Sequence, residues 1–306
     1  MERNGAERRE QADMKAFARY HPAVLFVYFL AVLLIAMFVS NPVLQLCALM
    51  GGALFGCMLE KRRELPGIAG FCILMFLLIC VTNPLFSHSG VTPLFFLNGN
   101  PVTLEAIVYG ATIAVMVIGV LLWCRCYSRI MTVDKQLFLF GRALPQLSLI
   151  LSMALRFIPL LKRQMHRVSA AQKAMGLYTA QNPIGRLRSA VRVFAALVAW
   201  SLENSLDTAA SMKARGYGLP ERTQFSLFRF GAADGVLLSV CVGLLGLILA
   251  CTAAGAVRFA YYPRLDALPM SPVSGTVYGA YAVLTLLPFI LEVKEALLWK
   301  YSVSKI

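Results

Sequence analysis

Long apolar segments separated by short polar ones dominate this chain of 306 residues. No Lys, Arg, Asp or Glu occurs between Arg19 and Glu60, or between Glu64 and Glu105. Each of these runs is about 40 residues long, whereas one helix needs roughly 20 apolar residues to cross a bilayer. Each run is therefore too long for a single span. The helix-breaking pairs Asn41-Pro42 and Pro66-Gly67 predict where the helices begin.

The apolar pattern predicts an all-α integral membrane protein with six spanning helices. The predicted spans cover residues 22–39, 42–59, 67–85, 103–123, 235–257 and 273–291. A hydrophobic content of 59% and a charged content of 14% agree with this class, because soluble domains are less apolar. Four regions are expected: an N-terminal segment (1–21), a four-helix membrane region (22–127), a cytoplasmic or interfacial region (128–230) and a C-terminal membrane region with a short tail (231–306).

The basic residues orient the predicted spans. Five Lys or Arg precede residue 20, three stand at 61–63, and sixteen lie between Arg125 and Arg229. The segments expected outside hold only Arg258 and Arg264. Because basic loops stay in the cytoplasm, we expect both termini to be cytoplasmic. The net charge of +14 is then explained by basic loops on the cytoplasmic side of the membrane. No nucleic-acid partner is expected.

Residues 144–161 are apolar enough to be considered as another span. Inserting them would move a basic flank outside, because Arg142 precedes the segment and Lys162 and Arg163 follow it. We therefore expect an interfacial or semi-buried helix there. The apolar segment 193–202 has about half the length that a span requires, so it should pack on its neighbours.

A short repeat stands out in this central region. Lys173-Ala174-Met175-Gly176 recurs as Lys213-Ala214-Arg215-Gly216. Each copy ends a segment that we expect to be a long helix, about 147–174 with Pro159 inside and about 186–214. Gly176 and Gly216 suit the left-handed residue that closes a helix.

Two interpretations of the repeat are open from the residues alone. Lys213 and Arg215 can simply stabilise a helix C-terminus, where a cation gains about 0.3–1 kcal/mol. Alternatively, a guanidinium held at a fixed helix end offers a rigid fork to a carboxylate on a partner protein.

The segments Arg156-Phe157-Ile158-Pro159, Gln172 to Gly176 and Met212 to Tyr217 resemble the transmembrane T component of energy-coupling factor (ECF) transporters, a family that includes the cobalt-transport CbiQ proteins. The resemblance covers roughly residues 22–257. It implies two cytoplasmic coupling helices, each docking in a groove of one of two ABC-type ATPase subunits. It also implies a membrane-embedded substrate-binding S component, a prokaryotic plasma membrane, and uptake of a vitamin or a transition-metal ion.

The resemblance assigns two coupling motifs and a set of supporting residues. Motif 1 is Ala174, Met175 and Gly176, and motif 2 is Ala214, Arg215 and Gly216. The supporting residues are Arg156, Pro159, Arg163, Arg167, Gln172, Lys173 and Lys213. The chain departs from the family pattern in two places. Met175 stands where arginine is usual, and the apolar segment 273–291 follows the last helix that we expect for the family.

The sequence offers little chemistry of its own. It contains no Gly-Lys pair and hence no phosphate-binding loop, so ATP hydrolysis is expected in partner ATPases. No cofactor is expected. A membrane enzyme or a secondary transporter acting alone is the alternative, and either would need polar groups inside the bilayer. Glu105, Asp234 and Glu292 are the acidic candidates, but they stand at the ends of predicted spans, where we expect water to solvate them.

Overall fold

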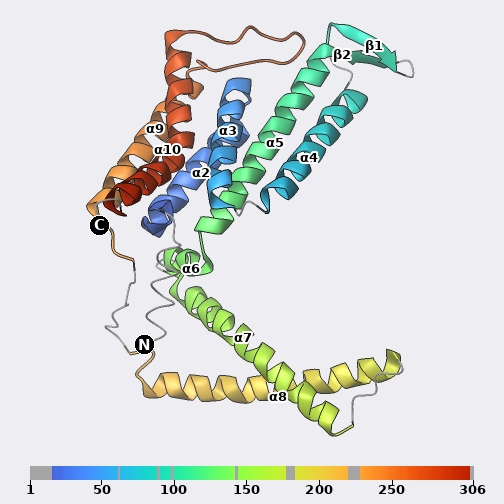
Figure 1. Cartoon of the computed structure of the whole chain (residues 1–306), viewed down its shortest axis with the longest axis vertical. Helices are drawn as coiled ribbons and strands as arrows, with labels where there is room; N and C mark the ends of the chain where they lie inside the picture. Colours follow the sequence, from blue (N-terminus) through green and yellow to red (C-terminus); the bar gives the residue numbers. More distant parts are fainter. Residues whose placement is uncertain are drawn as a thin grey trace. The chain divides into compact units, whose positions relative to one another are not determined.

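The computed structural model describes residues 16–60, 63–87, 90–97, 100–141, 144–176, 183–219 and 228–303. The chain divides into two units, Met1–Val133 with Phe228–Ile306, and Asp134–Leu227. The first contains η1 (Ala16–Arg19), α2 (Pro22–Phe38), α3 (Pro42–Leu59), α4 (Leu65–Phe86), β1 (Pro93–Leu97), β2 (Asn100–Thr103), α5 (Leu104–Ile130), α9 (Ala232–Ala253) and α10 (Pro272–Val303) (Figure 1). The second contains α7 (Pro145–Ala174) and α8 (Pro183–Ala214), and α6 (Val133–Gly141) leads into it.

The prediction of an all-α multi-pass membrane protein is confirmed. Among the described residues, five helices are long and apolar enough to cross a membrane: α3, α4, α5, α9 and the part of α10 up to Leu298. Helix α2 is equally apolar but has 17 residues. The boundaries differ most at α10, which continues to Val303 rather than ending at residue 291, and α5 continues to Ile130 rather than ending at Trp123.

Helix starts follow the capping residues that the sequence contains. Asn41 Oδ1 accepts the Val43 N–H at 3.0 Å directly before the proline that begins α3. His21 Nδ1 accepts the Ala23 N–H at 3.3 Å at the start of α2. These side chains satisfy backbone donors that the first helical turn leaves free. Helix α3 begins at Pro42, so the predicted break at Asn41-Pro42 is confirmed.

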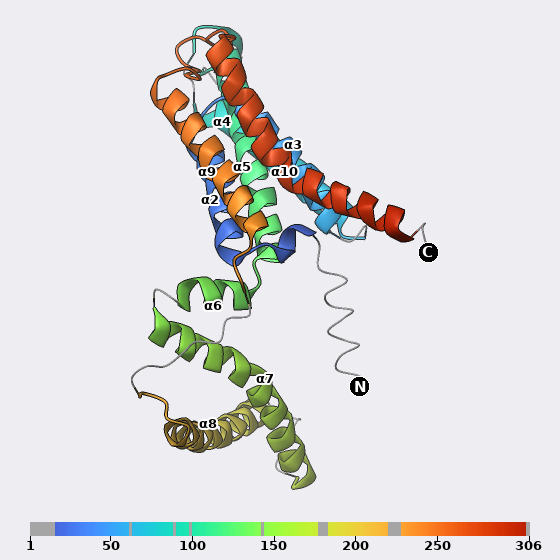
Figure 2. The same cartoon turned by 90° about the vertical axis from the view of Figure 1, so that its left-hand side faces the viewer.

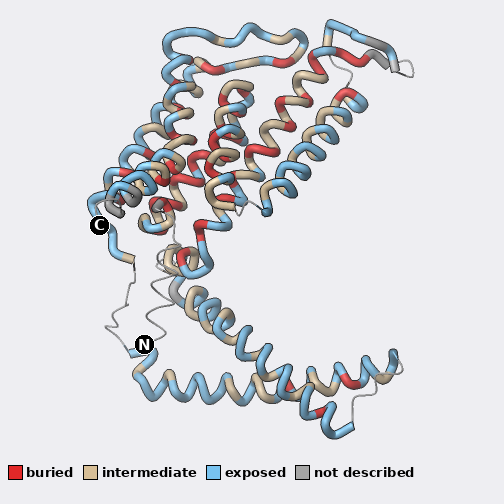
Figure 3. Tube along the Cα trace, in the orientation of Figure 1, coloured by how far each residue is buried: buried red, intermediate tan, exposed pale blue. Residues whose placement is uncertain are grey.

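Aromatic side chains form the core of the first unit. Trp123 of α5 is fully buried and donates its indole N–H to the Ala48 carbonyl oxygen of α3 at 2.8 Å. Phe17 of η1 meets the rings of Tyr28, Phe29 and Phe55 edge to face, with centroids 5.2–6.2 Å apart. Figure 3 shows that the buried residues of this unit gather on the facing sides of the helices. The core therefore ties the segment before α2 to the helix bundle.

Helices α3 and α10 approach each other closely at a glycine. A Cβ atom at Gly51 would lie 2.7 Å from Thr285 Cβ and 2.9 Å from the Thr285 carbonyl oxygen, closer than side chains pack. The absent side chain lets the two backbones come together, as small residues do in membrane bundles. Figure 2 shows that α10 changes direction part-way along its length, and Pro288 lies inside this helix.

The expectation that water solvates the three acidic residues is wrong. Glu105, Asp234 and Glu292 are all buried. Glu105 accepts the Thr92 hydroxyl at 2.6 Å, Asp234 accepts the His21 N–H at 2.8 Å, and Glu292 accepts the Phe17 N–H at 3.2 Å. The donors to Asp234 and Glu292 lie more than 200 positions away in the sequence. The sequence pattern therefore gave no sign of these two bonds. Through these hydrogen bonds, the three carboxylates hold the segments that contain Thr92, His21 and Phe17 against the helices.

Two elements were not expected. Strands β1 and β2 form an antiparallel hairpin in the segment predicted to be an outer loop, with Leu97 opposite Asn100 and Pro93 opposite Thr103. Thr103 then caps α5 by accepting the Ala106 N–H. The short helix α6 precedes α7, and Ser148 Oγ of α7 donates to the Leu137 carbonyl oxygen of α6 at 3.2 Å. Both elements are too short to produce a clear periodic signal.

Candidate coupling site

Helices α7 and α8 are the longest elements of the second unit, with 30 and 32 residues. Neither is among the helices apolar enough to span a membrane. Helix α7 begins at Pro145, where a proline fits the first helical position, and continues through Pro159. Its predicted supporting residues Arg156, Pro159, Arg163, Arg167 and Lys173 are exposed.

The two helices pack antiparallel. The rings of Phe157 on α7 and Trp200 on α8 stack with centroids 5.7 Å apart and planes 13° apart. Further along α7, Met165 and Ser169 share a hollow of about 460 Å³ with Arg186 and Ser189 of α8. Because positions increase along α7 while their partners decrease along α8, the pair is a helical hairpin. Gln172 lies in the same part of α7 and is only 8% exposed, and its Oε1 atom accepts no hydrogen bond from the described residues.

Both coupling motifs close a helix in the predicted way. Gly176 has φ +69° and Gly216 has φ +78°, so the expected left-handed conformation is confirmed at both. The Gly176 N–H donates to the Lys173 carbonyl oxygen at 3.1 Å, and the Gly216 N–H donates to that of Lys213 at 3.0 Å. At the second motif the Tyr217 N–H also donates to the Met212 carbonyl oxygen at 3.0 Å, which completes a Schellman motif.

The side chains at these helix ends face outward. Met175 is 64% exposed, and Arg215 and Lys213 are exposed as well. Among the described residues, no carboxylate forms an ion pair with Arg215. The guanidinium at the end of α8 is therefore held by a defined backbone turn while its donors stay open to another molecule.

The motifs lie far apart along the hairpin, as Figure 1 shows. Ser169 and Ser189 line the same hollow. A rise of 1.5 Å per residue carries α7 about 8 Å from there to Ala174, and carries α8 about 38 Å to Ala214, in roughly the opposite direction. The predicted site residues therefore form two separate ends rather than one cluster.

An exposed apolar stripe on α8 escaped the sequence analysis. We call it the α8 stripe, and its members are Ile184, Leu187, Val191, Phe194, Val198, Leu202 and Leu206. They recur every three or four residues, so they share one helix face. The same spacing was readable in the sequence, but only the structure shows that the described residues of the second unit leave these side chains 41–74% exposed. An apolar surface of this kind marks an interaction site.

The fold and this site define a class: a multi-pass α-helical membrane protein that carries an amphipathic helical hairpin between α5 and α9. The profile of the family described as cobalt transport protein (CbiQ) matches residues 14–226, more than two thirds of the chain. The chain belongs to this family.

Curated relatives carry the name energy-coupling factor transporter transmembrane protein EcfT. That of Leuconostoc gelidum is 30% identical over 105 residues, which are 34% of this chain and 39% of the relative. That of Listeria innocua is 36% identical over 105 residues, 34% of this chain and 40% of the relative. That of Streptococcus thermophilus is 34% identical over 117 residues, 38% of this chain and 44% of the relative. The matched region thus spans about two fifths of each of these relatives.

Proposed function

We propose that this chain is the transmembrane coupling component of an ECF-type importer, without catalytic activity of its own. It would reside in the plasma membrane of a prokaryote with both termini in the cytoplasm. The observation that carries the proposal is the pair of equivalent helix ends, Lys173 to Gly176 and Lys213 to Gly216, each closed by a left-handed glycine and each exposed. The EcfT name of the relatives supports it.

Each helix end would dock on one of two ABC-type ATPase subunits. Arg215 presents a planar fork of donors that fits a carboxylate in a groove of its partner. Met175 presents a flexible thioether instead, which suits an apolar groove. The separation of the two ends by tens of ångströms along the hairpin favours two binding partners over a single small one. Ala174 and Ala214 are exposed, and their small side chains would let the wall of a groove approach each helix end closely.

The α8 stripe would hold the S component. Its side chains are apolar and exposed over more than 20 residues of helix, a length comparable to the width of a membrane helix bundle. Such a stripe also suits contact with the lipid surface. Substrate recognition would then lie in the S component, whose ligand we expect to be a vitamin or a transition-metal ion.

Movement would pass through the hairpin. ATP binding closes an ATPase dimer, and helix ends fixed to its two subunits then shift relative to each other. The stacked Phe157 and Trp200 rings join the two helices, so a displacement at one end moves the α8 stripe with it. Packed elements transmit such shifts because they do not deform continuously. The S component would tilt and release its solute inside.

Reconstitution tests this proposal against a membrane enzyme or a secondary transporter acting alone. The full chain is co-expressed with candidate ATPases and an S component encoded near it, then purified through a tag on this chain. We expect two ATPases and one S component to co-purify, with ATP-dependent uptake in vesicles. Uptake or turnover by the chain alone would contradict the proposal.

A further inference from the structure

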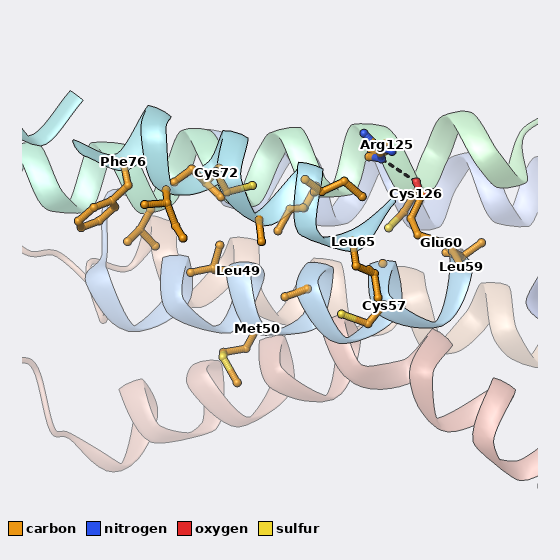
Figure 4. A pocket seen from close by; sticks show the side chains of 18 of the residues that line it. Leu49, Met50, Cys57, Leu59, Glu60, Leu65, Cys72, Phe76, Arg125 and Cys126 are labelled. Atoms are coloured by element: carbon orange, nitrogen blue, oxygen red, sulfur yellow. Dashed lines mark hydrogen bonds and ion pairs between the residues drawn. The ribbon is translucent and has the colours of Figure 1, made fainter. Parts of the chain in front are cut away.

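A groove of about 540 Å³ runs between α3 and α4, over the face of α5 on which both helices pack. Figure 4 shows side chains from all three helices around it, among them Leu49, Met50 and Phe76. Small residues leave the space open: Ala53, Gly56 and Cys57 on α3, and Ala69 and Cys72 on α4. All three helices are candidate membrane spans, so the groove lies at the depth of lipid.

The groove is as long as one leaflet is thick. Its floor on α5 extends from Val115 to Arg129, which corresponds to about 21 Å at 1.5 Å per residue. Half of a hydrocarbon core is about 15 Å, and the headgroup region adds several ångströms more. The length of the groove therefore fits the acyl chain of one lipid in one leaflet.

One end of the groove is charged. Glu60, with a side chain only 4% exposed, accepts Arg125 Nε at 2.6 Å and Arg129 Nη2 at 2.9 Å, and Arg129 Nη2 also donates to Glu64 at 2.8 Å. Figure 4 shows the bond between Arg125 and Glu60 at this end. The arginine side chains stay 44% and 50% exposed. Within the part of the chain that the structure describes, neither Nη1 group donates to a protein atom.

The loop beside these arginines adds positive charge. The two carboxylates balance Arg125 and Arg129, so the four groups together are neutral. Arg63 is exposed, and Lys61 and Arg62 precede it in the sequence. The mouth of the groove thus combines the open Nη1 donors of Arg125 and Arg129 with the positive charge of the exposed Arg63, a pattern that attracts anionic lipid.

We propose that this groove binds one anionic phospholipid of the surrounding bilayer. An acyl chain would lie between α3 and α4, and the phosphate would accept hydrogen bonds from the Nη1 groups of Arg125 and Arg129. The apolar lining excludes a polar solute. Arg63 distinguishes an anionic headgroup from a zwitterionic one, and the bound chain fills the space between two helices that both pack on α5.

Native mass spectrometry of the purified full chain tests the proposal with added phosphatidylglycerol or phosphatidylcholine. We expect phosphatidylglycerol to be retained at about fivefold lower concentration, since one basic residue near a membrane surface contributes about 1 kcal/mol. Ala53→Phe fills the groove and should abolish this binding. Leu74→Phe is the matched control, because Leu74 is an exposed α4 residue outside the groove lining. Arg63→Gln should reduce the preference while leaving the ion pairs of Arg125 and Arg129 with Glu60 intact.

A second measurement avoids any folding defect. In a Cys124→Ser background, the exposed Cys57 of the groove is modified with a bulky maleimide after purification, and should then lose bound phosphatidylglycerol. Equal retention of the two lipids would overturn the proposal. So would undiminished binding after Cys57 modification, or cross-linking of a photoreactive label on Cys57 to a protein instead of to lipid in the assembled complex.

Discussion

Phe157 on α7 and Trp200 on α8 stack nearly parallel, with ring centroids 5.7 Å apart, and this contact joins the two helices that carry the coupling motifs. Offset aromatic pairs contribute about 0.5–1.5 kcal/mol beyond the area they bury. The hollow between the helices begins at Leu197, about one turn along α8 from Trp200, so the stacked rings close the hairpin on one side of that hollow.

The first prediction concerns this pair. Phe157→Ala and Trp200→Ala should each lower the thermal stability of the purified chain, and a double-mutant cycle should give a coupling energy of about 0.5–1.5 kcal/mol. Each should also lower ATP-driven uptake in the reconstituted complex. Leu206→Ala, at an exposed α8 position, serves as the stability control. Fully additive single effects would show that the stack does not join the helices.

The two coupling motifs should contribute unequally to ATPase binding. Removing one partner of a buried charge pair costs about 2–5 kcal/mol, because the remaining carboxylate is stranded. Arg215→Ala should therefore weaken assembly by more than about tenfold and abolish uptake. Met175→Ala removes packing alone and should cost about 1–3 kcal/mol if the docked thioether is fully buried. Co-purification of each variant with both ATPases measures the asymmetry, and assembly lost only in Met175→Ala would reverse the assignment.

Met175→Arg identifies the chemistry of the groove that receives motif 1. If that groove holds an acidic residue, the new guanidinium should tighten assembly through a charge-assisted hydrogen bond. If the groove is apolar, as the native methionine suggests, an unpaired buried charge should loosen assembly. Titration of the variant against each ATPase separately gives the answer.

Gly216 should tolerate substitution less well than Gly176. Both have positive φ, but a Cβ at Gly216 would lie 3.0 Å from Leu219 Cδ1, whereas nothing described lies within 4 Å of one at Gly176. Valine at a left-handed position costs about 1–3 kcal/mol, and asparagine costs less. We expect ATPase co-purification to fall in the order Gly176→Asn, Gly176→Val, Gly216→Val. Equal assembly of all three would mean that the turns are not needed for docking.

The stability of the first unit should depend on pH through Glu60. Hydrogen bonds from Arg125, then Arg129, lower the pKa of the Glu60 carboxyl from 4.5 to about 2. Since the folded-state pKa is depressed, ionised Glu60 stabilises the fold above about pH 4.5, and this contribution is lost as the pH falls toward 2. Glu60→Gln should lower the melting temperature at neutral pH, and the difference from wild type should shrink below about pH 4.5. A constant difference down to about pH 3 would contradict this origin.

Topology is the last prediction. Basic loops should face the cytoplasm, so the turn between α3 and α4 is inside and the β1–β2 hairpin is outside. In a background without the exposed Cys57 and Cys124, Val91→Cys should react with a membrane-impermeant maleimide in intact cells. Tyr301→Cys, near the C-terminus, should react only after lysis. The reverse labelling pattern would place both termini outside.

Apolar patterning by itself determined the class of this protein. Charge-free runs of about 40 residues cannot be soluble and cannot be one span, so the spans and their approximate bounds follow from the sequence. The two glycine-closed helix ends were equally predictable, because a glycine that suits the left-handed closing position leaves a local signature. The family resemblance rested on these same residues, and the profile match over residues 14–226 agrees with it.

Only the tertiary structure decided which groups meet. The bonds from His21 to Asp234 and from Phe17 to Glu292 join residues more than 200 positions apart, and no local pattern encodes such a pairing. The groove between α3 and α4 likewise depends on how both helices pack on α5. The exposure of the α8 stripe depends on what its neighbours leave uncovered. Periodicity reports one helix at a time, whereas burial and pairing belong to the packed set of helices.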